Sequence, residues 1–217
     1  MDSGAFTEVT THGGYRYEPE EYAHQANRWV GNGGLLAIVS QDYMCEPFVL
    51  RKTGLTVRDH QRMTIERYAR IKKVSISNVI PVLQGYSIEE YLNHLEDYGN
   101  AGLLYPGMRI GVGSVCKRNS DVSKIEDILF AIKEKAPFLW LHGFGLKTTA
   151  LKSPTVWMLL FSADSMAWSY HARINRRNAN DWREAKRFEE AILNHPRSGP
   201  VMSRRRQVFE QLSLDVF

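Results

Sequence analysis

Short and almost continuously apolar runs recur along the chain, and each is bounded by residues that favour turns. The runs cover residues 35–39, 79–83, 108–112, 138–141 and 156–161. Continuous hydrophobicity over so few residues is typical of parallel strands that are buried on both faces. We therefore expect five strands in these ranges.

Amphipathic helical patterns separate these runs, over residues 60–73, 88–99, 123–135 and 181–193. Ser87 followed by Glu90 predicts an N-cap with a capping box, and Gly99 predicts the end of that helix. Alternating strands and helices predict an α/β fold with a parallel sheet. The spacing fits both a (β/α) barrel and an open doubly wound sheet. No G-x-G-x-x-G follows the first strand, which argues against a dinucleotide-binding open sheet.

Composition narrows the class of protein. The chain has 217 residues, of which 43% are hydrophobic and 24% charged, so we expect one globular domain over residues 1–217. It contains neither an apolar run of ~20 residues nor a signal-peptide pattern, and we expect a cytoplasmic protein without a membrane partner. Two cysteines, Cys45 and Cys116, are too few for a disulfide framework or a four-thiolate zinc site, so we expect no bound metal.

Positive charge gathers toward the end of the chain, although the net charge is only +4. Basic residues cluster at Arg173, Arg176, Arg177, Arg183, Lys186 and Arg187, and again at Arg204, Arg205 and Arg206. We expect a basic helical segment over residues 176–217. Clustered arginine suits contacts to phosphates, but a solvated helix face balanced by nearby Asp and Glu fits the pattern equally well.

Polar residues follow each apolar run: Asp42, Gln84, Ser114, His142 and Asp164. In a parallel barrel the carboxyl ends of the strands converge on one mouth, where active sites lie. Together these residues favour a functional site. Taken singly, each is explained equally well as a strand end where the chain turns polar.

Several segments resemble, in the same order, motifs of the tRNA-guanine transglycosylase superfamily. Asp2-Ser3-Gly4-Ala5-Phe6 resembles its D-S-G-G-[FY] segment, and Gln41-Asp42-Tyr43-Met44-Cys45-Glu46-Pro47 its F-D-E-C-T-P segment. Further similarities to [IV]-Q-G, V-G-G, G-[VI]-G and M-F-D-C lie at residues 82–85, 112–114, 142–145 and 161–165.

The D-S-G-A-F-T-E variant, and the lack of the C-x-C-x-x-C zinc cluster of the tRNA enzymes, make the chain most similar to the branch that exchanges guanine in DNA for a 7-deazaguanine base. This resemblance implies a TIM (β/α)8-type barrel. In the family the D-S-G segment ends the third strand, so we expect an incomplete barrel of about five strands plus the end of a sixth. A homo- or hetero-oligomer could complete it.

The resemblance also implies roles for residues. Asp164 would be the nucleophile and Asp2 the general acid/base. Base-binding residues would be Ser3, Asp42, Gln84, Gly85, Gly113, Ser114 and His142, with Tyr43 or Phe6 stacking on the base. Gly113 or Ser114 would offer a backbone N–H to the base carbonyl. Arg173, Arg176 and Arg177 would contact the nucleic acid, and no cofactor is implied.

Alternative interpretations stay open from the sequence. Asp2 could be a disordered terminal residue, Asp42 and Asp164 could be helix caps, and His142 could belong to the core. The chain could be an inactive nucleic-acid-binding or subunit-partner fragment, or an enzyme that acts on tRNA. A TIM-barrel enzyme for small phosphorylated substrates is a further alternative.

Overall fold

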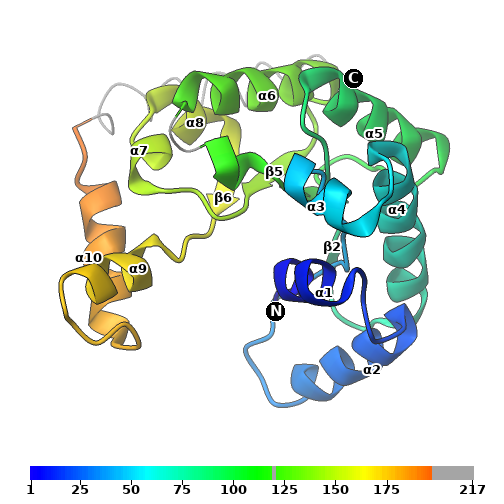
Figure 1. The fold of residues 1–217 in the computed structure, drawn as a ribbon, viewed down its shortest axis with the longest axis horizontal. Helices are drawn as coiled ribbons and strands as arrows, with labels where there is room; N and C mark the ends of the chain where they lie inside the picture. The colour runs from blue at the N-terminus through cyan, green and yellow to red at the C-terminus, as the bar shows by residue number, and fades with distance from the viewer. Residues whose placement is uncertain (119–120, 197–217) are drawn as a thin grey trace. The chain divides into compact units, whose positions relative to one another are not determined.

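Helices and short parallel strands alternate in a computed structural model, which describes residues 1–118 and 121–196 (Figure 1). The chain divides into two units, Met1–Ser114 and Val115–Phe217, named here the first and the second unit. Arg204, Arg205 and Arg206 lie outside the described residues, as does the part of the expected basic segment that follows residue 196.

The helices of the first unit are α1 (Ala5–His12), α2 (Pro19–Val30), α3 (Pro47–Thr53), α4 (Val57–Val74) and α5 (Ile88–Asn100). Ser87 caps α5 with the expected capping box, because its side chain accepts from the Glu90 backbone N–H while the Glu90 carboxylate accepts from the Ser87 N–H. The end of α5 was predicted wrongly, since Gly99 continues the helix and Gly102 takes the left-handed conformation instead, at φ +66°.

Four strands belong to the first unit: β1 (Ile38–Val39), β2 (Val79–Ile80), β3 (Val82–Leu83) and β4 (Arg109–Val112). β1 pairs in parallel with β2, and β3 with β4. The expectation of one strand over residues 79–83 is wrong, because Pro81 divides it. Proline has no N–H for the ladder, although the Pro81 carbonyl still accepts from the Gly111 N–H at 2.8 Å.

Met1 extends the pairing of β1. Its amino group donates to the Ala37 carbonyl at 2.7 Å, and its carbonyl accepts from the Val39 N–H at 2.9 Å. These two bonds bracket Ile38 in the pattern of parallel strands. Met1 therefore pairs with β1 as a strand residue would. Asp2, the next residue, lies at the same end of the pairing as the residues that follow β1.

The second unit contains the 3-10 helix η1 (Val115–Arg118), helices α6 (Val122–Lys135), α7 (Thr148–Leu151), α8 (Pro154–Leu159), α9 (Ala167–Ile174) and α10 (Trp182–Leu193), and strands β5 (Trp140–Gly143) and β6 (Leu160–Ala163). β5 and β6 pair in parallel, with an irregularity between Leu141 and His142. The α/β class with parallel strands is thus confirmed.

The strand expected over residues 156–161 is largely wrong, because its first four residues are the end of α8. The Ser153 side chain caps this helix by accepting from the Val156 N–H, and Pro154 occupies the first helical position. Such N-terminal signals favour a helix. The strand begins only at Leu160 and leads directly to Asp164.

Among the described residues, none of the helices combines the length and the apolar character that a membrane crossing requires.

Candidate base-binding and catalytic sites

Asp42 is a buried carboxylate just after β1, with 6% of its surface exposed. Its Oδ2 accepts a hydrogen bond from Gln84 Nε2 at 2.5 Å. Gln84 follows β3, so residues after two different strands meet here, as the sequence predicts. The pair offers a carboxylate and an amide, which is a hydrogen-bonding surface suited to a polar planar ligand.

Hydrogen bonds fix the orientation of Gln84. Its Oε1 accepts from Ser114 Oγ at 2.7 Å, which leaves Nε2 as the donor toward Asp42. Its backbone N–H donates to His94 Nδ1 at 2.9 Å, and its carbonyl accepts from Gln61 Nε2 at 2.8 Å. Gln84 therefore connects Asp42 and Ser114 in one preorganised network.

Glycine is required beside this network. A Cβ on Gly113 would lie 2.1 Å from Gln84 Nε2, and a Cβ on Gly85 would lie 2.9 Å from the Tyr91 backbone nitrogen. The Gly113 N–H donates to the Leu83 carbonyl at 2.9 Å. Of the two N–H groups expected to bind the base carbonyl, that of Gly113 is excluded because sheet pairing already occupies it, and that of Ser114 stays a prediction.

Burial, together with smaller contributions from the negative charges of Asp2 and Glu46, raises the pKa of Asp42 from 3.8 to about 7. The hydrogen bond from Gln84 opposes this shift by stabilising the ionised form. Asp42 thus changes its charge near neutral pH. The influence of Asp2 on Asp42 also indicates that these two predicted site residues lie near each other.

Tyr15 joins Ser3 to this group, although no sequence motif predicts it. The Tyr15 hydroxyl accepts from the Asp42 N–H at 2.9 Å and donates to the Asp42 carbonyl at 3.1 Å. Ser3 Oγ lies 3.1 Å from the same hydroxyl. Burial, and then the charge of Asp42, raise the pKa of Tyr15. No local motif marks this tyrosine, because its partners are distant in sequence.

The two residues expected to stack on a base differ in exposure. Tyr43 is buried and packs edge-on against the rings of Tyr15 and His60, with centroids 5.6 and 5.4 Å away. Phe6 is 54% exposed on α1. Tyr43 therefore contributes to the core beneath Asp42, whereas Phe6 presents its ring to solvent.

Glu46 is a second buried carboxylate, with 3% of its surface exposed. It stands at the N-cap of α3, yet its side chain makes no capping bond. In the described residues its Oε2 is buried without a hydrogen-bond partner. The sequence gives no signal for this, because a glutamate before Pro47 is normally interpreted as the start of a helix.

Asp164 and His142 form a separate polar group in the second unit. Asp164 Oδ1 accepts from the Gly145 N–H at 2.5 Å, and Oδ2 lies 3.7 Å from His142 Nε2. His142 Nδ1 lies 2.9 Å from Ser162 Oγ. The Asp164 side chain is 54% exposed, so its carboxylate is held by His142 of β5 and Gly145 just after β5 while it stays open to a ligand.

The predicted nucleic-acid-binding arginines differ in their contacts. Arg177 forms an ion pair with Glu184, at 2.8 Å from Nε to Oε1, and this glutamate is 5% exposed. Arg173 is exposed on α9, and Arg176 is exposed after it with φ 54°. Arg177 therefore ties the α9–α10 connection to α10, whereas Arg173 and Arg176 are accessible to phosphates.

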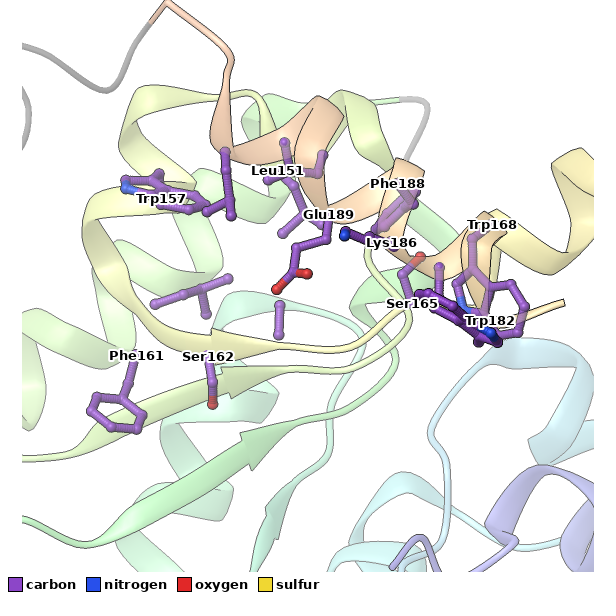
Figure 2. A pocket seen from close by; sticks show the side chains of 15 residues that line it. Leu151, Trp157, Phe161, Ser162, Ser165, Trp168, Trp182, Lys186, Phe188 and Glu189 are labelled. Carbon is purple, nitrogen blue, oxygen red and sulfur yellow. The ribbon is translucent and has the colours of Figure 1, made fainter.

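A cavity of about 750 Å3 lies beside β6 in the second unit (Figure 2). Trp157, Trp168 and Trp182 contribute to its walls, and Glu189 reaches into it from α10. Its lining includes Ala163 and Ser165, the two chain neighbours of Asp164. An aromatic-walled space thus lies beside the strand that leads to Asp164, although Asp164 itself does not line it.

The described residues contain no group of three or more His, Cys, Asp or Glu side chains arranged to hold a metal ion. Burial raises the pKa of the Cys45 thiol, so this cysteine stays protonated.

These features define an α/β protein with a buried carboxylate–amide network after parallel strands and a second, more accessible carboxylate after β6. A family model, DpdA (DeoxyPurine in DNA protein A), matches residues 1–181, and the chain belongs to this family. Membership links the chain to deazapurine modification of DNA. A search of curated proteins found no match.

Proposed function

We propose that the chain exchanges guanine in DNA for a 7-deazaguanine base by transglycosylation, within a TIM-type barrel. The observation that carries this proposal is the buried pair of Asp42 and Gln84. The guanine edge presents N–H donors at N1 and at the 2-amino group, and a carboxylate accepts two such bonds. The second N–H of the Gln84 amide and the Ser114 backbone N–H are the donors proposed for the guanine carbonyl. Membership of the DpdA family supports DNA as the substrate.

The reaction assigns separate tasks to two other carboxylates. Asp164 attacks C1′ of the deoxyribose, the C1′–N9 bond breaks, and its electron pair leaves with guanine N9. Asp2 gives a proton to the departing guanine. The incoming 7-deazaguanine then returns a proton from N9 to Asp2 and attacks C1′. This step breaks the aspartyl–deoxyribose bond and regenerates the Asp164 carboxylate.

The local geometry supports these roles. Asp164 is exposed, and the Gly145 N–H fixes one of its oxygens while the other faces His142. Asp2 is exposed and adjoins the base-binding group. A target guanine must leave the duplex to reach such groups, and the aromatic cavity beside β6 suits the stacking of bases.

Guanine release tests the proposal. The chain is incubated with duplex DNA that carries radiolabelled guanine, with and without a free 7-deazaguanine base. We expect at most one equivalent of label per chain to be released without the free base, because adduct formation expels one guanine, and continued release only when the free base is present. Asp164→Asn should abolish both. Glu66→Gln, on the exposed surface of α4, is the control and should retain full activity. Release from tRNA but not from DNA would contradict the proposed substrate.

A further inference from the structure

Glu46 has the features of a ligand-binding residue. Burying a carboxylate oxygen without a partner costs stability, and Oε2 of Glu46 is in this position among the described residues. Helix capping does not explain the residue. The Glu46 backbone carbonyl accepts the first bonds of α3, from Val49 and Leu50 at 2.9 and 3.1 Å, while the side chain takes no part.

The position of Glu46 connects it to the base-binding network. The preceding residue, Cys45, donates its backbone N–H to Ser114 Oγ at 3.3 Å. Ser114 binds Gln84, and Gln84 binds Asp42. Glu46 also lies close enough to Asp42 for its charge to act on that carboxylate, as does Asp2. The charges of Glu46, Asp42 and Glu90 all act on the Cys45 thiol.

We propose that Oε2 of Glu46 accepts the second N–H of the 2-amino group of the bound base, while Asp42 accepts N1–H and the first N–H. This inference rests on the proposed function and deepens it, because it assigns a residue that selects bases with an unsubstituted 2-amino group. Guanine and 7-deazaguanine share this edge, so one residue serves both the departing and the incoming base.

A comparison of guanine with N2-methylguanine distinguishes the proposed role of Glu46 from that of Asp42. N2-methylguanine keeps N1–H and one N–H for Asp42, but its methyl group replaces the hydrogen assigned to Glu46. A hydrogen bond to a charged group contributes enough for about 10- to 150-fold in affinity. We expect the chain to bind guanine more tightly than N2-methylguanine by a factor in this range, measured by calorimetry at pH 8.

Glu46→Met keeps the approximate volume of the side chain but removes the acceptor. In this variant the affinities for guanine and for N2-methylguanine should become nearly equal, because a thioether tolerates the methyl group. Glu46→Gln retains an acceptor oxygen and should keep part of the preference. Glu66→Met, on the exposed face of α4, is the matched control and should behave like the wild type.

Stability gives a second readout that a structural role would not produce. Since Glu46→Met removes an unpaired buried carboxylate, its melting temperature should rise, whereas loss of a structural contact would lower it. An unchanged preference for guanine in Glu46→Met overturns the inference, as does an equal affinity of the wild-type chain for both bases. Normal guanine binding by Asp42→Asn would instead overturn the proposed base site, so the two failures are distinguishable.

Discussion

Asp42 and His94 are buried ionisable residues whose pKa values shift in opposite directions. Burial raises the pKa of Asp42 from 3.8 to about 7, and burial lowers that of His94 from 6.5 to about 3. The Asp42 contribution to stability is complete below about pH 4 and is lost as pH rises to about 7. The His94 contribution is complete above about pH 6.5 and is lost as pH falls toward 3. Their effects therefore nearly cancel in the wild-type chain.

Asp42→Asn should remove this compensation. Its free energy of unfolding should fall by about 3 kcal/mol more than that of the wild type between pH 6.5 and 4, because the His94 effect then acts alone. Urea titrations across this range measure the difference. If the free energy of unfolding changed with pH in the same way in both proteins, Asp42 would have an ordinary pKa in the folded chain.

Sequence motifs predicted Asp42, Gln84 and Ser114, because each lies within three residues of the end of an apolar strand, and the structure brings these three together. Tyr15 and Glu46 were not identified. Tyr15 reaches Asp42 from a loop 27 residues away, and the burial of Glu46 depends on tertiary packing. The sequence pattern reports which residues end a strand, but not which side chains from elsewhere surround them.

At the scale of elements, the end of β4 must approach Gln84 closely. Gly113→Ala places a Cβ 2.1 Å from Gln84 Nε2, so the amide must move away from Asp42. Guanine affinity should fall at least about tenfold, the equivalent of one lost hydrogen bond to a charged group. Calorimetry measures it.

Gly31→Ala at the end of α2 is the control, because its backbone has φ −67° and a Cβ there meets nothing within 4 Å. It should bind guanine like the wild type. Equal affinities for Gly113→Ala and Gly31→Ala would mean that the Gln84 amide does not contact the base.

Helix α9 and the residues after it carry the exposed arginines Arg173 and Arg176, for which we propose contacts to DNA. Replacing Arg173 and Arg176 by Ala should weaken DNA binding on all sequences alike and reduce the salt dependence by about two phosphate contacts. Fluorescence anisotropy over a range of salt concentrations measures both. Arg177→Ala should instead lower thermal stability, since Glu184 loses one of its two arginine partners. Unchanged DNA affinity in the double variant would place the nucleic-acid contact elsewhere.

The elements themselves were only partly predictable. Helices α4, α5, α6 and α10 follow from amphipathic periodicity and capping residues, which are local signals. The apolar run over residues 156–161 was misinterpreted, because a short apolar run does not by itself distinguish a strand from a buried helix. In this run, the N-cap Ser153 and Pro154 at the first helical position favour the helix.

At the scale of the whole molecule, alternating apolar runs and amphipathic segments predicted the α/β class, and the strands pair in parallel as expected. Five polar strand ends were predicted to converge on one mouth. The structure brings Asp42 to Gln84 in the first unit and His142 to Asp164 in the second, and the convergence of all five stays a prediction. No local sequence pattern predicts whether a barrel closes, because barrel closure depends on pairing between segments far apart in the chain.

The proposed base exchange requires a covalent bond between Asp164 and deoxyribose. The most direct measurement incubates the wild-type chain and its variants with guanine-containing DNA and looks for a protein–DNA adduct that survives denaturant. We expect an adduct in the wild type and none in Asp164→Asn, because an amide is a far poorer nucleophile. Asp2→Asn should still form the adduct while turnover falls by ~10² to 10⁴, the usual contribution of general acid/base catalysis. An adduct in Asp164→Asn would contradict the account and make Asp42 the first alternative nucleophile.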